Sequence, residues 1–587
     1  MTRHYLDKMA MPMTEWICVT AIPLYLCNNK IETFQSFDEG TLLQWNLFVM
    51  GATALLSFIS IFPLGEACNN KQKMRGEGLV IGSHLIPVMF YAMHLLSAGQ
   101  ENGDTNQSIN AGMQHVIYSS CGGISFIISC LWSRTNRITE SMTSKKHDGV
   151  MKLCWKVYLA LLFSNHVVFS ITQHSQSHLP CTVLGLIHIF MVYCYGSTIF
   201  NNRGDQKQWQ DAFTCGEWMV VSNLAASLTG DFILLHFSSV SYNRDHFPEH
   251  VRIAHAGLVG CIVGIVYSQA SSRILRLGII GSLTSVIGVV IGFLELVCSR
   301  IPVSQIEWIA LPRSVQWILQ FLSDEVQVFI GGDERHICRY FILAYWSLVL
   351  IASIPLTIKL CSWVESDNIL KKKRIVIARK FFHLIAIILF TPITWLDPDL
   401  IALAYAIATT LLMILEIIRC HSIEQKQSNV TLSLNAFYKI FLDEKDSHAA
   451  EGGLAITQIT LIVGCSMPLW MSQIMNFNDN TLLVQFLPFI GVLVLGIGDS
   501  VGAIAGVNFG RHRWPGSTRT LEGSFSMYAS MFVPLFLVYT SDCWEIGVVL
   551  AIVTLLEAST SQIDNLCLPL AGTSLIALLR VPNASNK

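Results

Sequence analysis

Apolar segments of membrane-spanning length recur along this chain and constrain its fold more than any other feature. Hydrophobic residues make up 52% of the 587 residues, and charged residues only 13%, about half the 25% that is usual in soluble proteins. A transmembrane helix needs about 20 mainly apolar residues, and about seventeen runs meet this criterion. We therefore expect an all-α, polytopic integral membrane protein with about 15–17 transmembrane helices. The net charge of −2 gives no electrostatic support for a nucleic-acid partner.

The predicted spans cover most of the chain and suggest two regions. Residues 1–370 form an N-terminal multi-span membrane region. We expect residues 371–587 to form a C-terminal membrane region that carries most of the polar clusters described below. The candidate spans are near 16–27, 43–64, 78–98, 115–132, 151–171, 181–200, 218–240, 253–270, 275–298, 340–364, 380–396, 400–418, 453–474, 482–507, 525–540, 544–560 and 566–581.

The distribution of basic residues predicts the orientation of the spans. Lys and Arg collect on the cytosolic side of membrane proteins, and placing the N-terminus in the cytosol satisfies this rule for most loops. Loops 241–252 and 299–339 are exceptions, because they carry arginines on the predicted lumenal side. This orientation turns every polar cluster of the C-terminal third toward the cytosol, where nucleoside triphosphates are found. The segments concerned are 365–380, 419–452, 508–524 and 558–565.

The stretch Leu495–Gly523 carries the clearest chemical signal. It begins as an apolar membrane segment that contains Asp499, and it ends as a basic, glycine-rich loop. A charged group in hydrocarbon costs several kcal/mol, so an intramembrane Asp marks a candidate functional site. Arginines and backbone N–H groups bind polyphosphates, and a carboxylate suits the accompanying Mg²⁺. The loop offers Arg511, Arg513 and Arg519 among Gly510, Gly516 and Gly523.

Simpler interpretations of this stretch stay open. The glycines around Asp499 are also typical of closely packed membrane helices, and arginines at a cytosolic helix end can be topological anchors. Trp514-Pro515-Gly516 indicates a turn. No GxxxxGK[ST] motif occurs, which excludes a P-loop as the triphosphate site.

Further charged residues lie near the same predicted membrane face. Arg379, Lys380 and His383 open one span, although a basic helix end often only snorkels to the interface. Glu416 lies near the end of the next span. The charge run Asp443-Glu444-Lys445-Asp446 has the composition of a solvated loop. Glu557 and Asp564 bracket a short turn and are candidates for a second metal ligand or a general base.

The pattern GIGDSVGAIAGVNFGRHRWPGSTRTLEGS resembles the nucleotide-binding signature of dolichol kinases. The chain departs from that family at Thr518 and Arg519, where two lysines are usual. The first 370 residues resemble the family only in having many spans. Four further blocks of the C-terminal region resemble the family in the expected order: Arg379–Leu384, Leu415–Arg419, Phe441–Ser447 and Leu556 through Leu566 with Pro569.

The resemblance implies a CTP-dependent lipid kinase, a phosphotransferase with an alcohol group as acceptor. It would be a multi-pass protein of the endoplasmic reticulum membrane with a cytosolic catalytic face. Residues 371–587 would then be the C-terminal catalytic membrane region, with a cytosolic CTP-binding loop. It would move the γ-phosphate of CTP, with Mg²⁺ or another divalent cation, to the terminal hydroxyl of dolichol. The product, dolichyl phosphate, is the lipid carrier for protein N-glycosylation, mannosylation and GPI-anchor synthesis.

On this interpretation Asp499 would hold Mg²⁺, the loop arginines would balance phosphate charge, and Glu522 would complete the metal shell or pin the loop. Asp564 or His383 would accept the hydroxyl proton. The predicted catalytic residues are Asp499, Arg519, Glu522, Asp564 and His383, and the predicted metal ligands are Asp499, Glu522 and Asp564. The predicted nucleotide-binding residues are Gly498, Ser500, Asn508, Gly510, Arg511, Arg513, Pro515, Gly516, Thr518, Arg519, Thr520, Gly523, Lys380 and Lys445.

Two other functions remain as alternatives. A CTP-dependent cytidylyltransferase that acts on phosphatidate shares the GD…G…TxEG core and would release pyrophosphate. A polytopic ion-coupled transporter would use Asp499 to bind its coupling ion, but such proteins usually show paired half-repeats, and we find none. The sequence leaves open the oligomeric state, the preferred isoprenoid length and the role of the N-terminal spans.

Overall fold

The structure is a computed structural model of the whole chain. It describes residues 12–31, 79–98, 214–237, 248–275, 279–301, 311–330, 333–366, 370–425, 455–475, 485–538, 543–560 and 562–580, with short pieces of 47–55 and residues 120, 124 and 157. The predicted spans 115–132, 151–171 and 181–200 and the charge run at Lys445 lie essentially outside the described residues, as does most of span 43–64.

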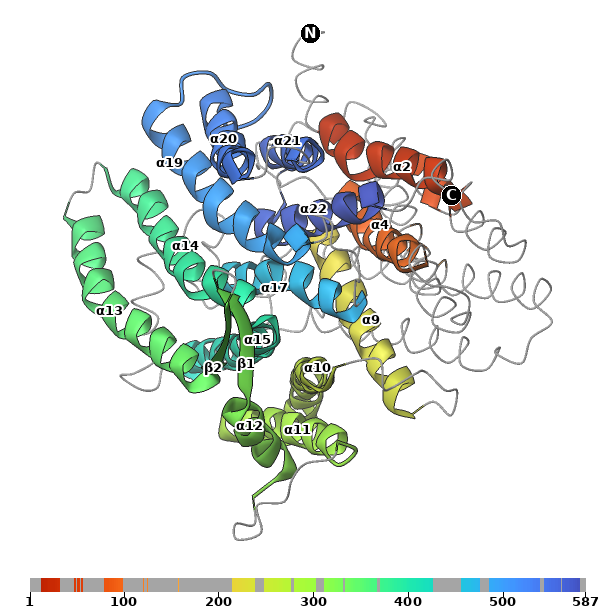
Figure 1. The fold of residues 1–587 in the computed structure, drawn as a ribbon, viewed down its shortest axis with the longest axis vertical. Coiled ribbons are helices and arrows are strands. Elements are labelled where there is room, and N and C mark those ends of the chain that lie inside the picture. The colour runs from red at the N-terminus through yellow and green to blue at the C-terminus, as the bar shows by residue number, and fades with distance from the viewer. Residues whose placement is uncertain are drawn as a thin grey trace.

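The described part of the chain is built from helices, with one β-hairpin (Figure 1). The hairpin pairs β1 (Glu325–Ile330) with β2 (Asp333–Cys338) in antiparallel register, within the predicted lumenal loop 299–339. The helices of the first half are η1 (Ile17–Ala21), α2 (Ile22–Ile31), α4 (Leu79–Ala98), α9 (Cys215–Phe237), α10 (Glu249–Leu275), α11 (Ile279–Cys298) and α12 (Arg313–Ser323). The later helices are α13 (Arg339–Glu365), α14 (Lys371–Leu396), α15 (Pro398–Gln425), α17 (Thr457–Met475), η4 (Leu487–Phe489), η5 (Val492–Gly498), α19 (Asp499–Phe509), α20 (Leu521–Val538), α21 (Cys543–Ser559) and α22 (Asp564–Arg580).

The prediction of an all-α polytopic membrane protein is confirmed, with the hairpin as a small addition. Among the described residues, 6 helical segments are long and apolar enough to cross a membrane. They are Glu249–Ser268, Gly281–Cys298, Arg339–Glu365, Lys373–Leu396, Pro398–Arg419 and Val492–Phe509. Some helices extend beyond the spans that were predicted for them. For example, α14 begins at Lys371 rather than at residue 380, because its basic first turns are helical although they are not apolar.

Helices from both halves of the chain share one hydrophobic core. Met89 of α4 and Val220 of α9 are fully buried in the same cluster as Leu550 of α21 and Leu568 of α22. Figure 1 shows α4 beside α22, with α17 and α9 close by. The start and the end of the chain are therefore packed together, and the predicted boundary near residue 370 does not separate two independent cores among the described residues.

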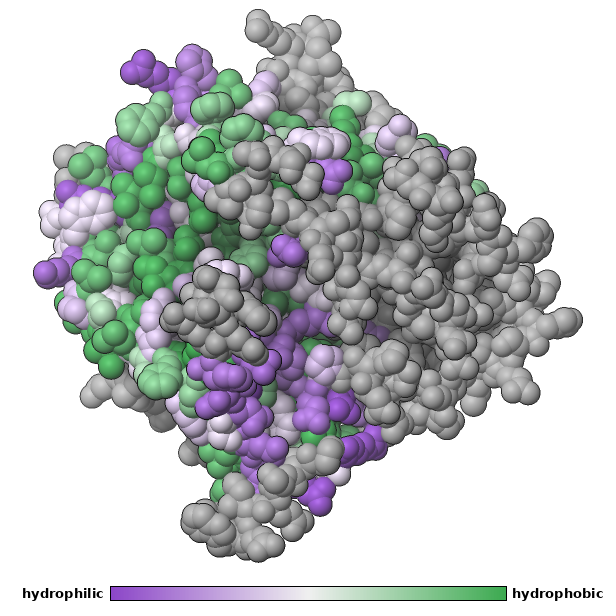
Figure 2. All heavy atoms as spheres, viewed as in Figure 1, coloured by the Kyte–Doolittle hydropathy of each residue, from purple (hydrophilic) through white to green (hydrophobic). Residues whose placement is uncertain are grey.

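The two ends of α14 meet different polar groups. At its C-terminal end, Asp397 accepts a hydrogen bond from Arg339 Nε at 2.7 Å, and Arg339 also donates to the Phe321 carbonyl of α12. Its basic end faces the region described below. On the face in Figure 2, hydrophobic residues cover the flank around α13, α14 and α19, while hydrophilic residues gather near α11 and α12 and near the α19–α20 loop. An apolar belt between two polar ends is the surface that a bilayer requires.

Candidate active site

Asp499 lies at a break in helix geometry. The π-helical turns of η5 end at Gly498, and α19 begins with Asp499. Such π-turns are uncommon and are frequent at functional sites. Asp499 is 6% exposed, so its charge needs compensation. Lys380 of α14 donates a hydrogen bond from Nζ to Asp499 Oδ2, and His383 Nε2 lies 3.5 Å from the same oxygen.

Several glycines of this stretch serve helix packing. A Cβ at Gly496 would lie 2.7 Å from the Ile387 side chain of α14, and one at Gly498 would lie 2.5 Å from Met531 of α20. Gly502 faces Met527 of α20 in the same manner. Small residues at these positions let α14 and α20 approach η5 and α19 closely. The simpler interpretation of these glycines is therefore supported, and Gly498, which we predicted to bind nucleotide, packs against Met531.

The segment between α19 and α20 folds back on itself as a short hairpin. Leu521 N donates to His512 O at 2.8 Å, and Trp514 N donates to Arg519 O at 3.1 Å. At its tip, Ser517 N donates to Trp514 O, and Gly516 has a φ of 75°. Pro followed by a residue with positive φ is the pattern of a type II turn, which favours Gly at that position. The turn predicted from the Trp-Pro-Gly sequence is thus confirmed.

The base of this loop is fastened to the first turn of α20. Glu522 accepts hydrogen bonds from the backbone N–H of His512 at 3.1 Å and from His512 Nδ1 at 2.6 Å. The Thr520 hydroxyl accepts from Gly523 N at 3.2 Å and so caps α20, and Trp514 Nε1 donates to the Ser524 hydroxyl. Of the two roles predicted for Glu522, the structure shows the pinning of the loop.

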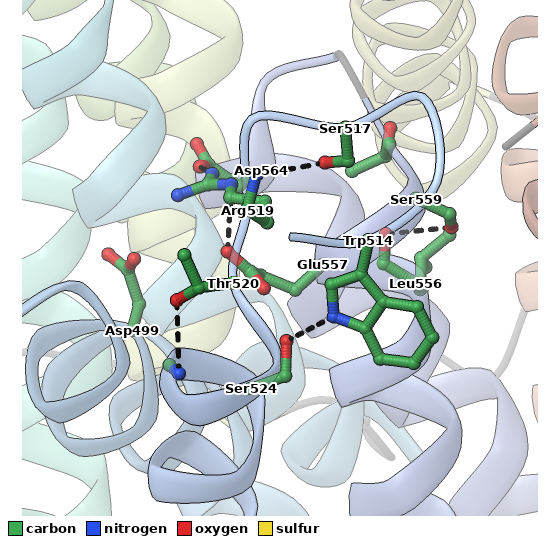
Figure 3. Close-up of polar contacts among 12 residues, drawn as sticks. Asp499, Trp514, Ser517, Arg519, Thr520, Ser524, Leu556, Glu557, Ser559 and Asp564 are labelled. Carbon is green, nitrogen blue, oxygen red and sulfur yellow. Dashed lines mark hydrogen bonds and ion pairs between the residues drawn. The ribbon is translucent and has the colours of Figure 1, made fainter. Parts of the chain in front are cut away.

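Arg519 turns inward from this loop and joins two carboxylates from other helices (Figure 3). Its Nε lies 3.0 Å from Glu557 Oε1 at the end of α21, and its Nη2 lies 2.9 Å from Asp564 Oδ2 at the start of α22. Burial disfavours the charged guanidinium, but Glu557, Asp564 and the nearby Asp499 outweigh this effect and raise the pKa of Arg519 above its usual value. The arginine therefore stays cationic, as a phosphate ligand must.

The structure brings together Lys380, His383, Asp499, Arg519 and Asp564 from the predicted set. The remaining loop residues Arg511, Arg513, Pro515 and Thr518 are exposed around it. The other predicted positions have local roles. Asn508 donates to Ile504 O within α19, a Cβ at Gly510 would lie 2.3 Å from Gly506 O, and the buried Ser500 hydroxyl has no hydrogen-bond partner among the described residues.

Metal binding stays a prediction for these residues. Within the described ranges, no group of three or more His, Cys, Asp or Glu side chains is arranged to hold a metal ion. The donor chemistry nevertheless suits Mg²⁺, which prefers oxygen ligands and often takes only one or two protein carboxylates, with phosphate oxygens and water completing its shell. Asp499 and Asp564 are the predicted ligands that fit this description, whereas Glu522 is engaged with His512.

The Leu415–Arg419 block has a separate place in the structure. Arg419 donates to both carboxylate oxygens of Glu416, at 2.9 and 2.6 Å, and both residues are buried. Glu416 also accepts from the backbone N–H of Ala455 at 2.5 Å. This ion pair therefore joins the end of α15 to the chain just before α17.

Sequence reasoning missed one group of residues that contacts the site from the N-terminal half. The backbone N–H of Ile563, which precedes Asp564, donates to Glu217 Oε1 at 2.6 Å. The spacing Thr214-x-x-Glu217 before an apolar run is a capping-box signal that the sequence does contain. The contact with Ile563 could not be read from it, because the partner is 346 residues away.

The fold and the site define a multi-pass, helical membrane protein with an ion-paired, arginine-containing site where α14, α19, α21 and α22 meet. Its relatives among curated proteins are dolichol kinases. The human protein is 29% identical over 430 residues, which are 69% of this chain and 71% of the relative. The mouse protein is 32% identical over 276 residues, 45% of this chain and 48% of the relative. Dolichol kinase EVAN of Arabidopsis thaliana is 29% identical over 286 residues, 46% of either chain.

The resemblance to dolichol kinases that the motifs predicted is thus confirmed. The matched residues span about half the length of the mouse and plant relatives and 71% of the human one. No protein-family model matches the chain. No solved structure matches it either.

Proposed function

We propose that this protein is a dolichol kinase that transfers the γ-phosphate of CTP to the terminal hydroxyl of dolichol. The observation that carries the proposal is the similarity to dolichol kinases from animals and a plant, together with the gathering of Lys380, Asp499 and Arg519 at one site. CTP as donor, and the endoplasmic reticulum membrane with a cytosolic catalytic face as location, follow from the resemblance and the charge distribution of the loops. They belong to the same proposal.

The chain's cations have the chemistry that phosphoryl transfer requires. This reaction depends mainly on alignment and on neutralising charge. The two ion pairs of Arg519 use Nε and Nη2, and a guanidinium has five N–H donors in all. Because the two ion pairs do not use all of these donors, Arg519 can also donate to a phosphate oxygen while the carboxylates hold its side chain. Arg511 and Arg513, exposed on the loop, add positive charge.

The ion pairs of Lys380, Asp499 and Asp564 would rearrange once a triphosphate is bound. Lys380 neutralises Asp499 in this structure, and an ammonium with three donors can turn toward phosphate oxygens. Asp499 and Asp564 would hold Mg²⁺. The metal supplies positive charge between the phosphates when it is bound.

The reaction has a simple balance of bonds. The dolichol oxygen forms a bond to the γ-phosphorus, and the bond from that phosphorus to the bridging oxygen breaks. CDP leaves with the electron pair. The hydroxyl proton passes to a base, for which Asp564 and His383 are the candidates. The acceptor arrives on an apolar tail, which suits a site that includes Lys380 and Asp499 of membrane-crossing helices.

A labelling experiment with membranes that contain the protein tests the proposal. Dolichol, phosphatidate, Mg²⁺ and CTP labelled at either the γ- or the α-phosphate are supplied, and ATP labelled at the γ-phosphate is compared. We expect label in dolichol from γ-labelled CTP. Label in phosphatidate from α-labelled CTP would identify a cytidylyltransferase instead. No transfer in competent membranes would favour the transporter.

A further inference from the structure

The N-terminal half of the chain reaches the turn that connects the two carboxylates of the site. Glu557 lies near the end of α21 and Asp564 is the first residue of α22. The turn between α21 and α22, of which the structure describes Thr560, Gln562 and Ile563, therefore connects the two partners of Arg519. We propose that Glu217 of α9 is a positioning residue that holds this turn, and so places Asp564 against Arg519. The inference rests on the proposed function only for its activity readout.

Glu217 belongs to a capping box at the start of α9. Its backbone N–H donates to the Thr214 hydroxyl at 3.2 Å, and Thr214 N donates to Glu217 Oε2 at 2.8 Å. This reciprocal pair satisfies two backbone donors that a helix start leaves open. The capping box uses only one of the two carboxylate oxygens of Glu217, Oε2.

The second oxygen of Glu217 binds the turn. Oε1 accepts from Ile563 N at 2.6 Å, and the Thr214 hydroxyl donates to the side-chain oxygen of Gln562. Glu217 is 1% exposed. Burying a carboxylate costs free energy unless hydrogen bonds compensate it. A capping box also works at an exposed helix end, so the cap alone does not explain why Glu217 is buried. The geometry therefore points to a role at the turn in addition to the cap.

A second buried acidic side chain, from the N-terminal part of the chain, lies at the same turn. Glu15, which is 8% exposed, is close enough to the Thr560 side chain for a hydrogen bond. Thr560 in turn accepts from Gln562 N at 3.2 Å. On the other side of the turn, Asn565 donates to the Thr457 carbonyl of α17 at 3.1 Å. The entry to α22 is thus fixed from several elements, two of which lie in the first 370 residues.

The test compares Glu217→Gln with wild type in the full-length protein in membranes, using kinetics with varied CTP and varied dolichol. An amide in place of the carboxylate keeps the shape but has one acceptor oxygen, so it cannot accept from both Thr214 N and Ile563 N, which bind different oxygens of Glu217. We expect kcat/KM for CTP to fall by about 10–100-fold, as is common for residues that orient a site's ligands. The KM for dolichol should stay unchanged. Thr229→Ala is the matched control and should behave as wild type, because the buried Thr229 hydroxyl donates to the Ala225 carbonyl of the same helix.

A double-mutant cycle with Asp564→Asn separates positioning from general destabilisation. If Glu217 acts through Asp564, the double variant should lose little more than Asp564→Asn alone, because coupled residues are not additive. Wild-type kinetics for Glu217→Gln, or additive losses in the cycle, would overturn the inference. If Glu217→Gln does not accumulate, Glu217→Asp is measured with the same expectations. An inactive wild type would instead count against the proposed function, and nucleotide binding by the same variants then tests the positioning role.

Discussion

Lys380 and Asp499, which lie 119 residues apart in the sequence, form a buried ion pair between α14 and the start of α19. The pair joins a basic residue of one block that resembles dolichol kinases to an acidic residue of another. Each residue alone has an ordinary explanation, the lysine as a snorkelling helix end and the aspartate as a buried polar group. Together they form a charged pair beside the arginine loop, where a metal-bound triphosphate would need both signs of charge.

Replacing Asp499 by Asn should abolish transfer while the protein still inserts and accumulates. The amide oxygen still accepts a hydrogen bond from Lys380, so the fold is kept, but the negative charge is lost. We expect turnover to fall at least about 100-fold, the usual loss when one preorganised charge interaction is removed from a site. Turnover is measured with γ-labelled CTP and dolichol. Asp324→Asn, an exposed carboxylate next to the β-hairpin, is the control, and retained turnover in Asp499→Asn would exclude its metal role.

Replacing Arg519 by Lys should damage the site although the charge is kept. A guanidinium contacts Glu557 and Asp564 through two separate nitrogens, and a single ammonium cannot reproduce that fork. We expect a lower kcat/KM for CTP in Arg519→Lys and a larger loss in Arg519→Met. Arg519→Met also leaves two carboxylates without their cation, which should cost about 1–3 kcal/mol of stability. Thermal unfolding in detergent measures this cost, and equal kinetics for the Lys variant and wild type would contradict the role of the fork.

Gly516→Ala should strain the tip of the loop. Its φ of 75° is unfavourable for a residue with a Cβ, by about 1–2 kcal/mol. Because the tip is exposed, we expect a raised KM for CTP with little change in the unfolding temperature. Gly292→Ala, in α11, meets no atom within 4 Å and serves as the control. Unchanged CTP kinetics in Gly516→Ala would mean that the conformation of the tip is unimportant for nucleotide binding.

The arginine loop and the β-hairpin should lie on opposite sides of the membrane. The basic end of α14 faces Asp499, while its other end meets Arg339 directly after the hairpin. We expect an impermeant maleimide to label Thr518→Cys in sealed, cytosol-side-out vesicles, and to label Gln327→Cys only after permeabilisation. Labelling of the parent chain is subtracted. Both cysteines reacting before permeabilisation would refute the predicted orientation.

Local patterns in the sequence predicted the elements well. Apolar run length predicted α4, α9, α13, α21 and α22 to within a few residues, since helix formation in lipid depends mainly on the residues of the span itself. The Trp-Pro-Gly turn followed from the backbone preferences of its own residues. Helix extensions such as the first turns of α14 were missed, because charged residues continue a helix without adding to its apolar signal.

The sequence by itself determined the class of this protein and the residue types of its site, because span length, charge and motif spacing are properties of neighbouring residues. Only the tertiary structure decided which of those residues meet. The pairing of Lys380 with Asp499, of Arg519 with Glu557 and Asp564, and of Glu217 with Ile563 depends on how distant helices pack. That packing depends on the shapes of many side chains at once, and on the missing Cβ atoms at Gly496 and Gly498. It cannot be predicted from a local sequence pattern.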